Sequence, residues 1–188
     1  MANDEGAVLP AAAGVLAGAM AWAVGYGVTY LAAAGRVREQ LEGLNTLVGL
    51  FGGGTLPTWK AVAWLYFNAH FVDVRLAAAG RSEAVNFVSR STGNAPLLYL
   101  LPPLALVCTV ALTMRVMDVR TLRAGVVGGA AALLGYGVAA LAMASLSAHA
   151  FGTVVVSVGV VTAVALAGVG YPLVFGTLGG ALSAQLRS

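Results

Sequence analysis

Charged side chains are missing from residues 124–186, and two further runs, residues 6–35 and 91–114, lack them as well. One crossing of a lipid bilayer needs about 20 mostly apolar residues, so the longest run has room for two crossings with a turn between them. A chain that keeps charge out of such runs has few side chains left for acid–base chemistry. The sequence therefore predicts an integral membrane protein that is not an enzyme.

Cysteine and histidine are also scarce. The single Cys108 lies in an apolar run, which excludes a disulfide framework and a cysteine metal site. His70 and His149 have no further ligand at metal-site spacing, whereas a zinc site needs three or four. The glycines at 52–54 are not followed by the lysine of a phosphate-binding loop. We therefore expect no catalytic residues, no metal and no cofactor.

The ten basic residues never form a run of five, so the net charge of +3 does not indicate a nucleic-acid partner. Hydrophobic residues make up 60% of the chain and charged residues 9%, and the mean hydropathy is +0.89. This composition predicts a single membrane domain over residues 1–188, located in the cell membrane as a multi-pass protein. The expected surroundings are membrane lipids.

The hydrophobic runs predict an all-α fold, a polytopic bundle of transmembrane helices. Four spans are expected at about residues 8–32, 96–114, 124–148 and 153–182. Between the first two, apolar residues recur at spacings of four, three, four and three, which predicts an amphipathic surface helix over residues 37–51. Its apolar face would consist of Val37, Leu41, Leu44, Val48 and Phe51.

A further membrane helix is expected over residues 57–79, but its path is open. Its apolar centre, residues 61–72, makes only about 18 Å of helix, which is short for a crossing. Lys60 at one end and Asp73 with Arg75 at the other could reach the two interfaces and complete a fifth span. The alternative is a re-entrant or interfacial helix.

Basic residues distinguish the two topologies through the positive-inside rule. Four spans place residues 115–123 and the C-terminus together, with four basic residues against six in the long connection; five spans give seven against three. The charge rule thus prefers five spans, whereas hydrophobicity prefers four. Both topologies predict a cytoplasmic C-terminus and 115–123 loop and an extracellular segment 82–94, and only the side of the N-terminus differs.

Two segments resemble each other. Residues 14–28 read GVLAGAMAWAVGYGV and residues 125–138 read GVVGGAAALLGYGV, which indicates either an internal repeat or shared packing chemistry. Glycines also recur four residues apart, a spacing that lets membrane helices approach closely within one chain or between subunits. The candidate packing residues are Gly14, Gly18, Gly125, Gly129, Gly176 and Gly180.

Polar residues gather at the end of the uncertain helix, namely Asn68, His70, Asp73 and Arg75. On a continuous helix, positions 70 and 73 share a face, so the carboxylate could orient the imidazole. The alternative is an ordinary polar helix end at the membrane interface, beside Trp64 and Tyr66.

Residues 55–75 read TLPTWKAVAWLYFNAHFVDVR, and VNF at 85–87 and LLYLLPPL at 97–104 follow. These stretches resemble a group of small integral membrane proteins from haloarchaea whose function is uncharacterised, some of them labelled as transporters. The resemblance implies a small polytopic membrane protein and brings no catalytic or binding residues with it.

The sequence is compatible with two functions. The first is a non-enzymatic membrane protein that acts through small-residue helix packing, either as a homo-oligomer or as an accessory subunit of a membrane complex. The second is a small transporter or channel whose pathway passes His70, Asp73 and Arg75. The sequence names no substrate or ion.

Overall fold

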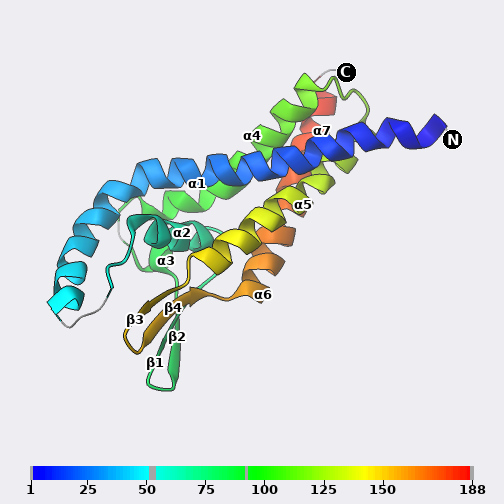
Figure 1. Ribbon diagram of the computed structural model, residues 1–188. Coiled ribbons are helices and arrows are strands. Elements are labelled where there is room, and N and C mark those ends of the chain that lie inside the picture. Colours follow the sequence, from blue (N-terminus) through cyan, green and yellow to red (C-terminus); the bar gives the residue numbers. More distant parts are fainter. Residues whose placement is uncertain (1, 51–53, 92, 187–188) are drawn as a thin grey trace.

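The computed structural model describes residues 2–50, 54–91 and 93–186 (Figure 1). Four helices in these ranges are long and apolar enough to cross a membrane: Val8–Gly43, Ala95–Val116, Leu122–Leu146 and Val160–Gln185. These match the four expected spans in number and approximate position. No fifth helix of that kind occurs in the described ranges, since the remaining longer helix, α2 (Thr58–Asn68), has only 11 residues.

The first helix is longer than expected. α1 (Ala2–Leu50) runs without a break through both the first expected span and the amphipathic segment, so the prediction of a separate surface helix over residues 37–51 is wrong. No proline or β-strand signal interrupts the chain between them, and Gly35 alone does not end a helix. Val37 and Leu41 are buried as expected, whereas the side chains of residues 44 and 48, and residue 51, lie outside the described part.

The other three long helices end close to the predicted limits. A 3-10 turn, Ala95–Leu100, leads into α4 (Leu101–Val116), and α5 is Leu122–Leu146. The last helix begins with α6 (Val160–Thr162), passes through two π-helical segments, Ala163–Gly170 and Pro172–Gly176, and ends as α7 (Thr177–Gln185). It starts seven residues later than predicted, because residues 154–158 form a strand.

The fold is not all-α, because a small antiparallel sheet is present. Its strands are β1 (Val74–Ala78), β2 (Arg81–Val85), β3 (His149–Phe151) and β4 (Val154–Val158), in the order β2-β1-β4-β3. The β-branched run of β4 suits a strand as well as a membrane helix, and hydropathy alone does not separate the two. Pairing of β1 with β4 joins two hairpins that are distant in sequence, which no local pattern reveals.

The predicted helix over residues 57–79 is correct only in its first half. α2 ends at Asn68, and a tight turn follows in which Phe71 takes a φ of 59°. The buried side chain of Asn68 binds the carbonyl of Val72, which draws the chain back on itself. The next residues then enter β1 in place of a further helical turn.

Glycines bring the long helices into backbone contact. A Cβ added at Gly14 or Gly18 of α1 would overlap the carbonyl of Gly128 or Ala132 of α5. The residue numbers of these contacts rise together along both helices, so α1 and α5 pack in parallel. These two helices also carry the two similar segments of the sequence. Between α5 and the last helix the pairs run the opposite way, with Gly125 against Gly180 and Gly129 against Gly176.

The molecule has two unlike ends (Figure 1). The N-terminus, the turn between α4 and α5, and the end of α7 lie together at one end, and the sheet, α2 and α3 (Phe87–Arg90) lie at the other. The larger apolar core joins α1, α2, α5, the last helix and the inner face of the sheet. The sheet and α2 are thereby fixed against the helices by a shared core.

Candidate functional site

Asn68 and His70, two of the four polar residues singled out by sequence, lie at or just after the end of α2, which is held by the two flanking helices. Lys60 Nζ donates to the Ala148 carbonyl at 2.6 Å, and Trp64 Nε1 donates to the Ser147 carbonyl at 3.2 Å. From α1, the Tyr26 hydroxyl donates to the Trp59 carbonyl at 3.0 Å. These bonds fasten α2 to the C-terminal end of α5 and to α1.

His70 is fully buried, and both ring nitrogens are hydrogen-bonded. Nδ1 lies 2.7 Å from the Tyr66 carbonyl oxygen, which can only accept, so Nδ1 carries a proton. In the neutral ring Nε2 is then an acceptor, and the Tyr136 hydroxyl at 2.7 Å donates to it. The Tyr66 hydroxyl, 3.0 Å from that of Tyr136, completes the chain by donating to it. All three side chains are therefore satisfied in one arrangement of protons.

Aromatic rings enclose this chain. Trp22 stacks on His70 at a centroid distance of 5.5 Å and meets the Tyr66 and Tyr136 rings edge-on at 5.0 and 4.9 Å. The ring of Tyr171, a residue between the two π-helical segments, lies at a centroid distance of 4.8 Å from the His70 ring. The indole Nε1 of Trp22 is buried without a hydrogen-bond partner. The surroundings thus exclude water and favour uncharged forms of the ring groups.

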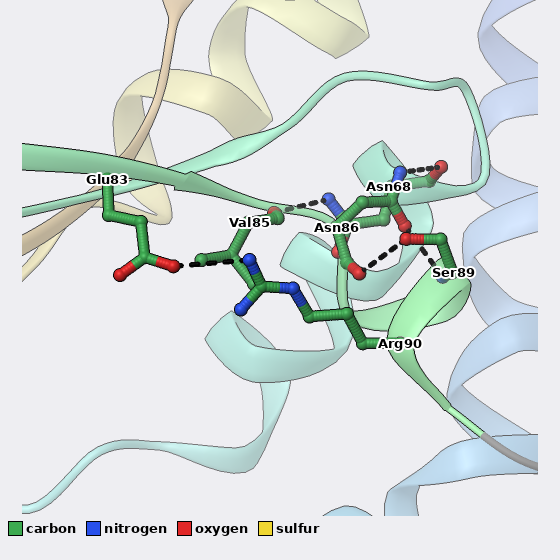
Figure 2. A network of polar contacts seen from close by, with 6 residues as sticks. All are labelled: Asn68, Glu83, Val85, Asn86, Ser89 and Arg90. Atoms are coloured by element: carbon green, nitrogen blue, oxygen red, sulfur yellow. Dashed lines mark hydrogen bonds and ion pairs between the residues drawn. The ribbon is translucent and has the colours of Figure 1, made fainter.

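Asn68 occupies a second buried polar centre, shown in Figure 2. Its Nδ2 donates to the carbonyls of Val72 at 2.8 Å and Val85 at 3.4 Å, and its Oδ1 accepts from the Phe87 amide at 2.8 Å. Asn86 Nδ2 donates to the Asn68 carbonyl at 3.2 Å. One side chain thereby joins the end of α2, the end of β2 and the start of α3, a junction that we call the α2 corner.

Figure 2 also shows two further polar contacts, one made by Asn86 and one made by Arg90. Asn86 caps α3 by accepting from the Ser89 amide at 3.1 Å. Arg90 and Glu83 form an ion pair of 3.1 Å between two exposed side chains. Such an exposed pair contributes little to stability, so the buried Asn68 bonds hold this corner together.

The four residues of the predicted polar cluster do not converge. Asn68 and His70 are buried and bonded to different partners, whereas Asp73 and Arg75 are exposed at the start of β1. The expected pairing of His70 with Asp73 is wrong, because the helix ends before either residue. Two open depressions, of about 310 and 260 Å³, lie at the tip of the β1–β2 hairpin and beside the α4–α5 turn, and neither is lined by cluster residues.

Tyr136 and Trp22 are not among the site residues predicted from the sequence, and Tyr66 was expected only as an interfacial aromatic. A signal was present in the Gly-Tyr-Gly-Val ending of both similar segments. Tyr26 and Tyr136 are equivalent positions in these segments, and each binds α2, Tyr26 at its start and Tyr136 near its end. Gly25 leaves the space that the Tyr66 hydroxyl occupies. Among the described residues, no group of three or more His, Cys, Asp and Glu could hold a metal ion.

Acidification is expected to destabilise the fold through His70. Burial lowers the pKa of His70 from 6.5 to about 4, so below pH 6.5 the unfolded chain takes up a proton that the folded chain does not. The free energy of unfolding should therefore fall by up to about 1.4 kcal/mol per pH unit between pH 6.5 and about 4. Unfolding measured in detergent across this range should show the slope in wild type and in His149→Gln, and a flatter one in His70→Gln. An equal slope in all three would contradict this account.

No curated protein and no solved structure matches the chain. A family model does match, described as a family of unknown function (DUF7978), and it spans residues 2–187. A match over nearly the whole chain covers α1, the α2 corner, the sheet and the last helix together. The chain belongs to this family of unknown function.

Proposed function

We propose that the chain is a non-enzymatic integral membrane protein that serves as an accessory subunit or homo-oligomer, anchored by a close-packed bundle and contacting its partner through the sheet. Exposed large apolar side chains on the long helices support the membrane location, for example Leu31 at 86% and Val161 at 83% exposure. A protein in water rarely displays such a surface over all of its helices. The resemblance to haloarchaeal membrane proteins belongs to the same proposal.

The exposed apolar helix surface carries the membrane part of this proposal, whereas the candidate glycines count against their expected role as a partner surface. Each of the six faces the backbone of another helix of the same molecule, so the small-residue faces build the bundle. They are then not free to receive a second subunit. A partner contact has to use another surface.

The outer face of the sheet supplies that surface. The register places Ala84 beside Arg75, and Ser82 beside Ala77 and then Val155, all on the side away from the core. These five side chains are exposed, and most of them are small. A face of mostly small residues with one cation can approach another protein closely, because few long side chains stand in the way.

Cross-linking in native membranes tests this proposal. Ala84→Cys, made in a Cys108→Ala background, should give a product of fixed size with a bifunctional thiol-to-amine reagent. Ala142→Cys, an exposed alanine on α5, is the matched control and should give none. A product of twice the chain mass indicates a homo-oligomer, and another fixed mass indicates a different subunit. If Ala84→Cys gives no discrete product, the proposal is wrong.

The transporter or channel alternative is favoured by one observation. The last long helix is π-helical over most of its middle, and Tyr171 at the junction lies against His70. Single-turn π-bulges inside α-helices occur frequently at functional sites. Against it, His70 is fully buried, Asp73 and Arg75 are exposed, and none of the three lines either of the two open depressions. Purified protein in sealed liposomes should show no dissipation of proton or cation gradients above protein-free liposomes, and a flux lost in His70→Gln would favour the alternative.

The four-span arrangement predicts on which side of the membrane the N-terminus, the α4–α5 turn and the β1–β2 hairpin lie. An N-terminal tag and Met117→Cys should be labelled from the same side, which we assign to the cytoplasm, and Ser82→Cys should be labelled from the extracellular side. Both cysteine variants would be made in the Cys108→Ala background and treated with a membrane-impermeant maleimide on intact cells and on inverted vesicles. An N-terminal tag accessible from the side of Ser82 would require a fifth crossing and contradict this topology.

A further inference from the structure

We propose that Tyr136 and His70 form a one-electron redox site, and that its reactant is a lipid peroxyl radical. Oxidation of a phenol becomes easier when its proton can pass to a base already bonded to the hydroxyl. Tyr136 meets this condition, because its hydroxyl donates to His70 Nε2 at 2.7 Å. This inference goes beyond the accessory role and depends only on α1 lying in the bilayer.

In a buried site that otherwise favours the neutral imidazole, the products of oxidation keep partners that are already in place. Once Nε2 takes the proton, the imidazolium keeps its Nδ1–H bond to the Tyr66 carbonyl at 2.7 Å. The Trp22 ring, stacked on His70 at an interplanar angle of 24°, faces the new cation with its π-surface. The phenoxyl oxygen keeps the hydrogen bond from the Tyr66 hydroxyl at 3.0 Å. These partners are in place before oxidation, which favours a low reorganisation energy.

A chain of oxidisable rings connects the buried pair with the surface of the bundle. The ring centroids of Tyr66 and Tyr26 are 6.1 Å apart, and those of Tyr26 and Tyr30 are 6.2 Å apart. Tyr26 and Tyr30 are half-buried, whereas Tyr66 and Tyr136 are fully buried. Both half-buried rings belong to the long apolar helix Val8–Gly43, so a radical formed in the acyl chains is the oxidant that would reach them.

The reaction balances without a metal or another cofactor. The peroxyl radical takes a hydrogen atom from the Tyr30 hydroxyl, breaking that O–H bond and forming the O–H bond of a lipid hydroperoxide. An electron then passes from Tyr136 through Tyr66 and Tyr26 to the Tyr30 radical, which also takes a proton from water and leaves a hydroxide ion in the solvent. Tyr136 loses its proton to His70 Nε2. One peroxyl radical is reduced and one Tyr136 is oxidised, so each chain acts once until the radical is reduced again.

The site is tested by electron paramagnetic resonance on protein in nanodiscs after one-electron photo-oxidation with a ruthenium–bipyridine complex. Wild type should give a phenoxyl radical that persists for seconds and shows coupling to an exchangeable proton and to an imidazole nitrogen. Tyr136→Phe should lose this signal, and Tyr99→Phe, outside the chain of rings, should keep it. His70→Gln should lower the yield about a hundredfold, the lower limit of what a positioned base contributes.

The lipid reactant is tested in vesicles of polyunsaturated phospholipid oxidised by an azo initiator. Wild type should delay oxygen uptake for the time in which the initiator produces about one radical per chain. The Tyr26→Phe, Tyr30→Phe double variant should shorten this delay while keeping the photo-oxidised radical. A wild-type protein without the persistent radical, or with a radical lacking the nitrogen coupling, overturns the Tyr136–His70 site even if His70→Gln fails to fold. A radical without any delay of oxygen uptake overturns the lipid peroxyl assignment.

Discussion

Gly18→Leu is expected to destabilise the bundle by about 3 kcal/mol or more, the upper range for overpacking a filled interior. The first added carbon already overlaps the carbonyl oxygen of Ala132, and this obstacle is backbone that cannot rotate away. α1 would have to move away from α5, which separates the neighbouring contact between Gly14 and Gly128 as well. Unfolding by sodium dodecyl sulfate, followed by circular dichroism in mixed micelles, measures the change.

Gly27→Leu is the matched control, because it makes the same substitution in the same helix. A Cβ at Gly27 meets no atom within 4 Å, and leucine favours the helix over glycine by roughly 0.8 kcal/mol. We expect unfolding within about 1 kcal/mol of wild type, with a small gain in stability. Equal stability of the two variants would show that α1 and α5 do not pack through Gly18.

The long helices could be predicted from sequence because their determinants are local. Uncharged runs such as residues 124–186 leave few alternatives to a helix hairpin, and glycines four residues apart indicate close packing. The pattern does not state which glycine faces which helix, since packing within the chain and between chains needs the same spacing. Only the three-dimensional pairing of Gly125 with Gly180 distinguishes them.

The region from Asn68 to Val85 could not be predicted in the same way. Its conformation depends on contacts that are distant in sequence, such as the pairing of Val74 with Val158. A valine-rich strand and a short apolar helix have similar composition, so hydropathy assigned β1 and β4 to helices. The His70 partner was missed for the same reason, because Tyr136 lies 66 positions away.

Asn68 is expected to be the least replaceable polar residue of the α2 corner. Asn68→Ala leaves the Phe87 amide and the Val72 carbonyl without their partner, at a cost of about 1–3 kcal/mol for each buried group. Asn68→Asp keeps the shape and the acceptor for the Phe87 amide, but it places a carboxylate oxygen against the carbonyls of Val72 and Val85. An uncompensated buried charge costs more than a missing bond, so Asn68→Asp should be the less stable variant.

Hydrogen exchange and chemical unfolding together distinguish this prediction from a general loss of packing. The Phe87 amide should exchange much faster in Asn68→Ala, because its bond to Oδ1 is gone, whereas Asn68→Asp should keep part of its protection while the protein unfolds more readily. Asn94→Asp is the control, since Asn94 is exposed and its side chain caps nothing, and it should stay within about 0.5 kcal/mol of wild type. A stable Asn68→Asp protein would mean that the amide donors do not face the two carbonyls, and the turn that leads α2 into the sheet would need another explanation.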